Sequence, residues 1–527
     1  MLQSVFLNIN FQFHWWYTLV LLILVILIND LFISRKHTIL RNFPLVGHLR
    51  YFLEEIGPEL RQYIVANNRE ELPFNRSQRS WIYASAKKEN NYEGFGSDQD
   101  QDATNYIFIK PSLFPYRLDE NHINAKDPYF LPCAKVIGAY HKRRKPFRPY
   151  SVINISAMSY GSLSAAAITA LNQGAKDSGC YHNTGEGGLS KYHSHGSDVV
   201  FHFGTGYFGV RDSEGNFSIE KLKALVDEHP FIKAIEVKLS QGAKPGKGGV
   251  LPAKKINLEI SKIRGVEMGK DVISPSFHMA FTTIPEMIDF IELIATETGL
   301  PVGIKSAVGK LDMWNDLARE MIRTGHGPDF ITIDGGEGGT GAAPPSFAHH
   351  VSLPFNYAFT DIYRVFQEHG LDDKLVFIGA GKLGLPSRGV MAFSMGIDII
   401  NVAREAMISI GCIQAQKCHT NTCPVGIATQ KKWLQRGLHV PDKAERFSNY
   451  VKAYRKEFLE LTHAAGYEHP AQFSMEDVKM NTSDFYQSKH LSEIFAYQKT
   501  TVPFNTMEEL SMCEYLGGRK YAEISKS

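Results

Sequence analysis

The chain has 527 residues, with 57 Lys plus Arg against 55 Asp plus Glu, a net charge of +2 and 43% hydrophobic residues. A chain of this length buries a large core and forms either several domains or one large domain with extensions. The balanced charge argues against a nucleic-acid-binding protein, which would carry a clustered basic excess. The six cysteines are too sparse for a disulfide scaffold.

The first recognisable element is the apolar segment Trp15–Ile33. As a helix rising ~1.5 Å per residue it would be about 28 Å long, close to the hydrocarbon thickness of a bilayer. We predict a single transmembrane helix over residues 13–34. A cleaved signal peptide would need a basic segment before the apolar run and a small-residue cleavage site, and the sequence shows neither. A buried core helix is the other alternative, but such helices are rarely apolar on every side at this length.

Basic residues flank the apolar segment on one side only. Arg35, Lys36, Arg41 and Arg50 follow it, and no Lys or Arg precedes it. The positive-inside rule therefore predicts a single-pass protein of the cytoplasmic membrane, with everything after residue 34 in the cytoplasm. That compartment is reducing, which suits free thiolates and iron–sulfur chemistry.

Residues 35–150 are polar and mixed, and we expect them to form an N-terminal extension that packs on the following domain. From residue 151 short β-rich runs alternate with helical patterns such as 163–176, 285–298, 313–324 and 386–395. Eight strands are expected, at 152–159, 181–184, 234–240, 271–275, 302–307, 330–335, 375–379 and 398–403. Such alternation predicts an α/β fold with a parallel sheet, and eight units favour a closed (β/α)8 TIM barrel over an open doubly wound sheet.

The barrel domain is expected to span residues 151–430 and to end in a loop that contains cysteines. A helical C-terminal extension is predicted for 431–527, with one helix at 442–465.

Two glycine-rich segments follow late strands of the predicted barrel, FITIDGGEGGTG at 330–341 and LVFIGAG at 375–381. Backbone amides in such loops approach a phosphate or a flat ring closely. Tight turns are the plainer explanation, but the pairing favours a phosphorylated cofactor, since phosphate sites often follow the last barrel strands. Segments 204–209 and 336–341 also match the dinucleotide fingerprint, yet no helical pattern follows either directly, so we predict no nicotinamide-binding domain.

Cys412, Cys418 and Cys423 have the spacing C-x5-C-x4-C, and a proline follows the last cysteine. Three thiolates suit an iron–sulfur cluster with three irons. A zinc site that adds His419 as its fourth ligand is the alternative, and purely structural cysteines are a third.

Charged residues also stand where predicted strands end. The loop KLSQGAKPGKGG carries Lys238, Lys244 and Lys247 after a strand, which suits a dicarboxylate clamp or, equally, a solvated loop. Lys305 lies in the apolar run VGIKSA, so we expect it to point into the barrel, where a cation would stabilise a reduced flavin. Glu186 is a carboxylate between glycines, and its pattern alone assigns it no role.

Six segments together resemble the synthase region of glutamate synthases, and most of all the short members described as FMN-binding glutamate synthase family proteins. They occur in one order over more than half of the chain: ISAMSYGSLS (155–164), NTGEGG (183–188), IEVKLSQGAKPGKGG (235–249), SPSFH (274–278), IDGGEGGTGAAP (333–344) and GCIQAQKCHTNTCPVGIATQ (411–430).

The resemblance implies a (β/α)8 barrel that holds FMN at its C-terminal face beside a 3Fe–4S cluster. The implied chemistry adds ammonia to 2-oxoglutarate and reduces the resulting 2-iminoglutarate to glutamate with hydride from reduced FMN. Lys305 and Glu186 would be the catalytic residues, with Lys305 at the flavin pyrimidine and Glu186 near the entry of ammonia.

The resemblance also assigns binding residues by motif. Cys412, Cys418 and Cys423 would hold the cluster. The flavin would contact Met158 and Ser159, and its phosphate would lie among Gly335, Gly336, Gly379 and Gly381. The carboxylates of 2-oxoglutarate would bind Lys244 and Arg264, with Gln241 nearby.

The chain also departs from the family pattern. Val250 stands where the family usually has Gln, and NVAREAM at 401–407 replaces a glycine-rich turn. No glutaminase half is recognisable, so ammonia and electrons are expected from outside, the latter from ferredoxin or a membrane electron carrier.

Three functions remain open on this basis. The leading one is a membrane-anchored FMN and iron–sulfur oxidoreductase that makes glutamate. The second keeps the cofactors but acts on another 2-oxo or amino acid, and the third is a non-catalytic membrane redox sensor.

Overall fold

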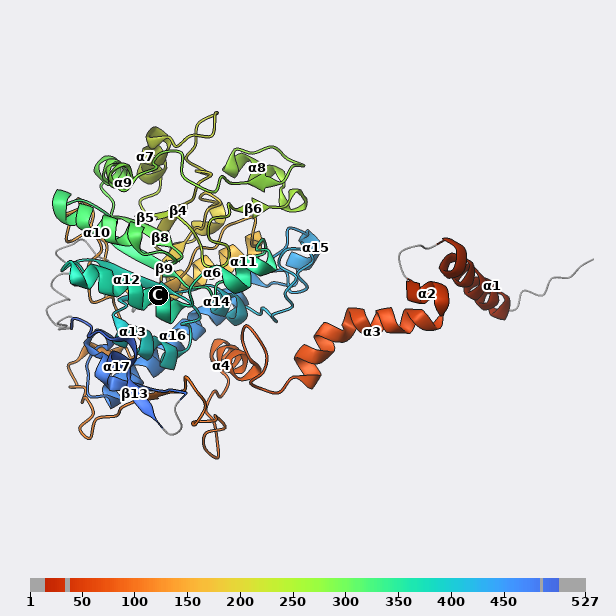
Figure 1. The fold of residues 1–527 in the computed structure, drawn as a ribbon, viewed down its shortest axis with the longest axis horizontal. Coiled ribbons are helices and arrows are strands. Elements are labelled where there is room, and N and C mark those ends of the chain that lie inside the picture. The colour runs from red at the N-terminus through yellow and green to blue at the C-terminus, as the bar shows by residue number, and fades with distance from the viewer. Residues whose placement is uncertain (1–14, 34–37, 484–486, 502–527) are drawn as a thin grey trace, which may run out of the picture. The chain divides into compact units, whose positions relative to one another are not determined.

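The computed structural model describes residues 15–33, 38–483 and 487–501 (Figure 1). The chain divides into two compact units, Met1–Ser77 and Gln78–Ser527. The domain boundaries expected at residues 34, 150 and 430 stay predictions.

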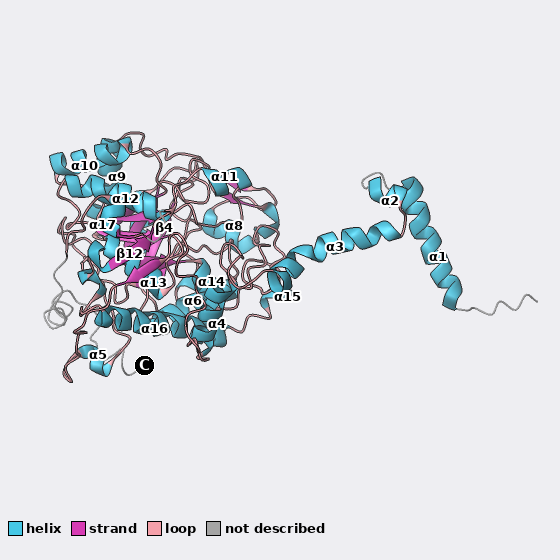
Figure 2. Ribbon diagram, turned by 60° about the horizontal axis from the view of Figure 1, so that its bottom comes forward, coloured by secondary structure: helices cyan, strands magenta, loops and turns pink. Residues whose placement is uncertain are grey.

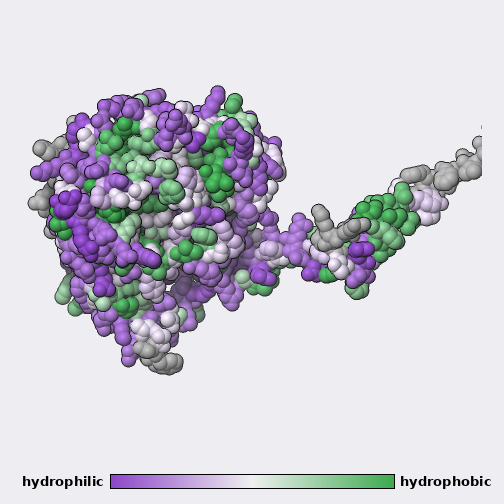
Figure 3. Space-filling model, turned by 45° about the horizontal axis from the view of Figure 1, so that its top comes forward, coloured by the Kyte–Doolittle hydropathy of each residue, from purple (hydrophilic) through white to green (hydrophobic). Residues whose placement is uncertain are grey.

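The first unit is built from helices. The apolar segment forms α1 (Trp15–Ile28) and continues in a π-helical turn, η1 (Asn29–Ile33). Together they are long and apolar enough to cross a membrane and are almost wholly exposed, although an N-terminal signal sequence meets the same criterion. Figure 3 shows the apolar side chains of α1 as a green surface. The remaining helices of this unit are α2 (Thr38–Asn42), α3 (Val46–Leu60) and η2 (Arg61–Val65).

The second unit contains a closed barrel of eight parallel strands, which confirms the predicted fold (Figure 2). In order around the barrel the strands are β2 (Ile153–Ile155), β3 (His182–Asn183), β4 (Val199–Phe203), β5 (Ile232–Lys238), β8 (Val302–Ser306), β9 (Phe330–Asp334), β10 (Val376–Ala380) and β11 (Ile399–Val402). The barrel closes where β11 pairs with β2 in parallel.

Helices surround the barrel, and their ends follow from the sequence. For α9, Thr283 caps the first turn in a capping box with Glu286, and Gly299 ends the helix in the left-handed conformation. The helices of the outer layer are α6 (Ala165–Ser178), α7 (Ile219–Glu228), α9 (Ile284–Thr298), α10 (Asp312–Thr324), α12 (Phe355–Glu368), α13 (Pro386–Met395) and α16 (Val440–Ala464). Further helices are α4 (Arg76–Lys87), α5 (Ile123–Lys126), α8 (Leu258–Arg264), α11 (Pro345–His350), α14 (Arg404–Ser409) and α15 (Lys432–Gln435).

One of the eight expected strands was wrong. The run at 271–275 contributes β7 (Val272–Ile273), which pairs antiparallel with β6 (Val250–Leu251) in a two-stranded sheet outside the barrel. The barrel strand that the sequence pattern missed is β4, VVFHF. Only a loop with the short 3-10 turn η3 (Lys191–His193) connects β3 to β4, so the helical pattern that marks the other units is missing here. Lys238 therefore ends the fourth barrel strand, whereas the expected strand at 234–240 was the third in the predicted order.

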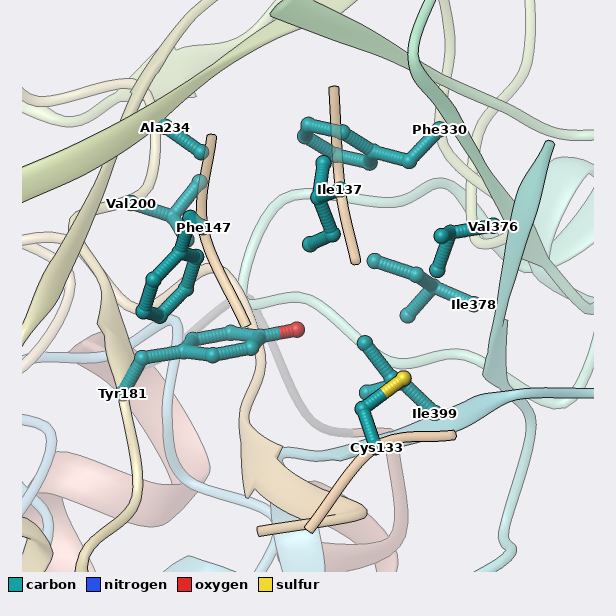
Figure 4. Packing of buried hydrophobic residues seen from close by; sticks show 10 residues of the cluster. All are labelled: Cys133, Ile137, Phe147, Tyr181, Val200, Ala234, Phe330, Val376, Ile378 and Ile399. Carbon is teal, nitrogen blue, oxygen red and sulfur yellow. The ribbon is translucent and has the colours of Figure 1, made fainter. Parts of the chain in front are cut away.

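The N-terminal end of the barrel is closed by the segment that precedes β2. Within this segment Ile137 forms a bridge with Phe147, and Leu131 with Ser151. Figure 4 shows Ile137 and Phe147 inserted among side chains of the strands. The buried cluster that they form consists of Cys133, Ile137, Phe147, Tyr181, Val200, Ala234, Phe330, Val376, Ile378 and Ile399. Because this end is filled with apolar side chains, a ligand must bind at the opposite, C-terminal end.

The core tolerates no added volume at Gly303, in β8. A Cβ there would lie 2.4–2.5 Å from three ring atoms of Phe330. We expect Gly303→Ala to destabilise the fold by about 1–3 kcal/mol, the usual effect of overpacking. The matched control is Gly309→Ala, because a Cβ at Gly309 meets nothing within 4 Å. The unfolding temperatures of both variants test this, and equal temperatures would contradict it.

The described part of the C-terminal extension combines helices with a small sheet. After α16 it forms the short turns η5 (Pro470–Gln472) and η6 (Met475–Asp477), then β12 (Val478–Asn481), β13 (Ser488–His490) and α17 (Leu491–Phe495). β12 pairs antiparallel with β13 and with β1 (Ile107–Ile109), so the two extensions of the barrel share one small sheet.

Candidate functional site

The loops that follow the barrel strands meet at the C-terminal end, because parallel strands all end on one side. Five predicted site residues line one cavity there: Ser159 after β2, Glu186 after β3, Gln241 and Lys244 after β5, and Arg264 at the end of α8. The cavity wall is completed by Ser162, Phe208, Gly249, Val250, Leu251, Val272, Ser274 and Thr340. Its free volume is about 40 Å³.

Arg264 is a buried cation in this wall. Its Nη2 donates to Ser159 Oγ at 3.4 Å and to the backbone oxygen of Tyr160 at 3.2 Å. The guanidinium also lies over the ring of Phe208, at 5.3 Å from the centroid. Among the described residues its Nε has no hydrogen-bond partner. Burial lowers the pKa of Arg264 to about 10, so the group stays charged at neutral pH and is suited to an anionic ligand.

Lys244 is a second buried cation, with 3% of its surface exposed. Its Nζ donates to the backbone oxygen of Gly248 at 3.0 Å. Burial lowers the pKa of Lys244 to about 8, although the negative charge of Glu186 opposes this shift. Lys244 therefore titrates near physiological pH.

Glu186 supplies the negative charge of the cavity. Its Oε2 accepts a hydrogen bond from Lys238 Nζ at 2.6 Å, and the same Nζ donates to Gln241 Oε1 at 2.8 Å. Burial alone would raise the pKa of Glu186, but the charge and hydrogen bond of Lys238 lower it to about 2. Gly249 makes room for this carboxylate, since a Cβ there would lie 2.3 Å from Glu186 Oε1.

Lys305 is buried in β8, with 6% of its surface exposed, and its Nζ lies 3.6 Å from Asp334 Oδ1. Lys305 also stands close to Glu236, a fully buried residue of β5, and its charge helps to keep Glu236 ionised. Burial opposes ionisation of Glu236, yet hydrogen bonds from His202 and Thr332 together with Lys305 lower its pKa to about 2.

The carboxylate of Glu236 is fully hydrogen-bonded inside the barrel. It accepts from Asn183 Nδ2 at 2.7 Å, from His202 Nδ1 at 2.6 Å and from Thr332 Oγ1 at 2.6 Å. A buried anion held in this way lies beside the cation of Lys305, which helps to keep it ionised. This network was not predicted. The one hint of it in the sequence is the presence of polar residues inside otherwise apolar strands.

The glycines expected to surround a phosphate pack tightly on their neighbours. A Cβ at Gly335 or Gly381 would lie 2.7 or 2.4 Å from Phe355 Cβ, and one at Gly379 would lie 2.3 Å from Ile397 Cδ1. A Cβ at Gly336 would lie 2.7 Å from a backbone oxygen. Packing alone therefore requires glycine at these positions, and their role in holding a phosphate stays a prediction.

Three cations gather near these glycines, after the last two barrel strands. Lys382 follows β10, Arg388 lies in α13 and Arg404 begins α14. Burial lowers the pKa of each, and the charge of Glu337 counteracts that shift for all three. Arg404 Nη2 donates to the backbone oxygen of Glu337.

The Glu337 side chain is itself bound, because Oε2 accepts from the backbone N–H of Phe355 at 2.9 Å. Lys382 and Arg404 also lie near the carboxylate of Glu405, and ammonium and guanidinium groups gathered in this way suit a phosphate. The sequence analysis missed these cations, although Lys382 directly follows the glycine-rich segment at 375–381.

The three cysteines of the predicted cluster lie on one loop after α14, and Cys423 is the most buried of them. Two neighbours fix the loop: Lys255 Nζ donates to the backbone oxygen of Cys418 at 2.8 Å, and Tyr83 Oη to that of Cys412 at 2.6 Å. Within the described ranges, no three His, Cys, Asp or Glu side chains converge closely enough to hold a metal ion. The cluster therefore stays a prediction.

The chain is similar to proteins of known family. Residues 103–468 match the family model described as the conserved region in glutamate synthase. The glutamate synthase large subunit-like protein YerD of Bacillus subtilis is 41% identical over 484 residues, which cover 86% of this chain and 91% of that protein. The archaeal glutamate synthase [NADPH] of Methanocaldococcus jannaschii is 32% identical over 366 residues, 68% of this chain and 67% of that one.

Among solved structures, mandelate oxidase with (S)-4-hydroxymandelic acid matches with a TM-score of 0.41 and 12% identity, over 77% of this chain and 91% of that chain.

Proposed function

This chain belongs to the glutamate synthase family of oxidoreductases, and on that premise we propose that it makes glutamate from 2-oxoglutarate and ammonia at the mouth of the barrel. The observation that carries the proposal is a pair of buried cations, Arg264 and Lys244, in the wall of a single cavity that Glu186 also lines. Two cations in one small cavity match the two carboxylates of 2-oxoglutarate.

FMN is the proposed cofactor, and the residues present fit it. When bound, it supplies the hydride that reduces a carbon–nitrogen double bond. The cations Lys382, Arg388 and Arg404 would hold its phosphate, together with Gly335, Gly336, Gly379 and Gly381. Met158 and Ser159 would contact the ring system. Lys305 would lie at the pyrimidine end, where its fixed charge favours the reduced flavin.

The substrate-binding residues perform two tasks. Arg264 and Lys244 bind the carboxylates and so orient the keto carbon, while Gln241 is held in place by Lys238. The apolar Val250 and Leu251 in the wall exclude water from the reacting carbon.

Glu186 is proposed to guide ammonia into the cavity. Because Lys238 keeps the carboxylate ionised, Glu186 attracts ammonium to the mouth of the barrel. Ammonia and electrons are proposed to come from outside the chain, with ferredoxin or a membrane electron carrier as the electron donor.

We also propose a 3Fe–4S cluster on Cys412, Cys418 and Cys423, supported by their spacing and by the family. Iron and sulfide analysis of anaerobically purified protein tests this, with about three irons per chain expected. Stoichiometric zinc without iron would instead indicate a site that includes His419.

The helix at residues 15–33 is proposed to anchor the protein in the cytoplasmic membrane, with the catalytic unit on the cytoplasmic side. Residues 13–34 would be the transmembrane domain, 35–150 and 431–527 the two extensions, and 151–430 the barrel. In inside-out vesicles added protease should digest the catalytic unit, and full protection would contradict this orientation.

The activity is tested anaerobically with dithionite-reduced protein, 2-oxoglutarate and nitrogen-labelled ammonium. Labelled glutamate is the expected product. A panel of other 2-oxo acids tests the second candidate, which Val250 favours because it removes a polar contact to the keto acid. If no acid in the panel reoxidises the bound flavin, the redox-sensor alternative replaces both.

The titration of Lys244 gives the activity a pH limit. With a pKa of about 8, Lys244 is charged below that pH and loses its charge as the pH rises. We therefore expect kcat/KM for 2-oxoglutarate to fall about tenfold per pH unit above pH 8. Lys244→Arg should move the fall to higher pH, since arginine stays charged. An unchanged profile in that variant would remove Lys244 from the binding site.

A further inference from the structure

The surface over the cysteine loop is strongly basic. Residues 406–441 contain no Asp or Glu, whereas exposed Lys417, Lys431, Lys432 and Arg436 all lie in this range. The next acidic residue, Asp442, is paired with Lys443 and Arg446. We call this surface the basic face. It consists of Lys417, Lys431, Lys432 and Arg436, together with Lys254 and Trp433.

Two more residues belong to the basic face. Lys254 is exposed beside the loop, where its backbone oxygen accepts from Asn421 Nδ2 at 2.9 Å. Trp433, between the basic residues of α15, has 67% of its surface exposed. An exposed indole among lysines is typical of side chains that lie at the headgroup level of a membrane.

The chain enters the catalytic unit beside this face. The unit begins at Gln78, within α4, and Tyr83 of α4 donates its hydroxyl hydrogen bond to Cys412 on the loop. Figures 1 and 2 both draw α4, α14 and α15 on the same side of this unit. The covalent link from the proposed membrane helix therefore joins the catalytic unit at α4, which contacts the loop that carries the basic face.

We propose that the basic face lies against anionic phospholipid headgroups, so that the cysteine loop of the barrel is turned toward the membrane. This inference rests on the membrane anchoring proposed above. Lysines and arginines near an anionic leaflet are attracted to it over about one Debye length, and several of them together with an apolar ring give stable contact. An acidic protein is the competing partner for such a surface.

The test uses the full chain reconstituted in vesicles, either of neutral phosphatidylcholine alone or with about one third anionic phosphatidylglycerol. Hydrogen exchange of the backbone at 411–439 is measured in both. We expect exchange to slow at least threefold in anionic vesicles and the protection to vanish at high salt. The triple variant Lys431→Glu, Lys432→Glu and Arg436→Glu should lose this protection.

The matched control reverses three exposed lysines elsewhere, Lys126→Glu, Lys145→Glu and Lys374→Glu, and should keep the protection. Lys145 and Lys374 lie near the closed end of the barrel, before β2 and β10. Equal exchange in the two vesicle types overturns the proposal, and so does protection that appears only when an acidic electron-transfer protein is added. Vesicle flotation is recorded in parallel: failure of the chain to float refutes the anchoring itself, whereas flotation without protection refutes only the basic face.

Discussion

Replacing Arg264 with Leu is expected to lower kcat/KM for 2-oxoglutarate by about 100-fold or more, without destabilising the fold. The activity falls because a carboxylate loses its charge-assisted hydrogen bonds, worth roughly 1.5–3 kcal/mol each. Stability does not fall because Arg264 is a buried cation whose Nε has no partner in the described part of the chain and whose nearest acceptors are neutral oxygens. An unpaired buried charge costs free energy to desolvate, and an apolar side chain at this position removes that cost.

Steady-state kinetics and the unfolding temperature together show whether Arg264 binds substrate or stabilises the fold. Steady-state kinetics should show the loss mainly in KM, and the unfolding temperature should stay equal or rise. Arg264→Lys is the matched variant, since it keeps the charge without the planar fork and should retain part of the affinity. A large fall in unfolding temperature with an unchanged KM would make Arg264 a structural residue and not a ligand for substrate.

Replacing Lys305 with Met is expected to lower the midpoint potential of bound FMN by about 30–60 mV. The reduced flavin carries negative charge, and loss of a nearby cation weakens it by roughly 1.4–2.8 kcal/mol, at about 30 mV per 1.4 kcal/mol for two electrons. The variant should also be less stable, by about 3 kcal/mol, because Asp334 and Glu236 lose a compensating charge.

Lys135→Met is the control for the loss of stability. Lys135 is an equally enclosed cation at the other end of the barrel, where it donates to Asp398 Oδ2 at 3.1 Å and to two backbone oxygens. It should destabilise the fold by a similar amount and leave the flavin potential unchanged. Spectroelectrochemical titration of both variants gives the comparison, and equal potentials in the two would remove Lys305 from the flavin site.

Much of the fold is readable from the chain because each βα unit repeats the same pattern. Helices such as α9 begin and end at residues with strong capping preferences, Thr283 and Gly299, so local chemistry fixes them. β4 was not predicted, because no helix precedes it and because its alternation of His202 with apolar residues is too short to be recognised as a strand. The run at 271–275 was wrongly predicted to be a barrel strand, because the strands of a two-stranded sheet and those of a barrel have the same local propensities.

The residues of the candidate site also fall into those that could be predicted from the sequence and those that could not. Ser159, Glu186, Gln241, Lys244 and Arg264 were assigned through motifs, and the structure brings all five to one cavity. The carboxylate network under Lys305 was not predictable, because Glu236, His202 and Thr332 come from three strands far apart in sequence and meet only when the barrel closes. The cations Lys382, Arg388 and Arg404 were missed for a similar reason: they come from different segments and lie around Glu337 only in the folded chain.

The central claim is that the barrel mouth holds a flavin which reduces the imine of a bound keto acid. The most direct measurement follows the absorbance of anaerobically reduced protein after mixing with substrates. Reoxidation is expected only when 2-oxoglutarate and ammonium are both present, with one glutamate formed for each flavin reoxidised. A colourless protein that takes up no FMN on reconstitution, or a flavin that stays reduced with both substrates present, would contradict the account.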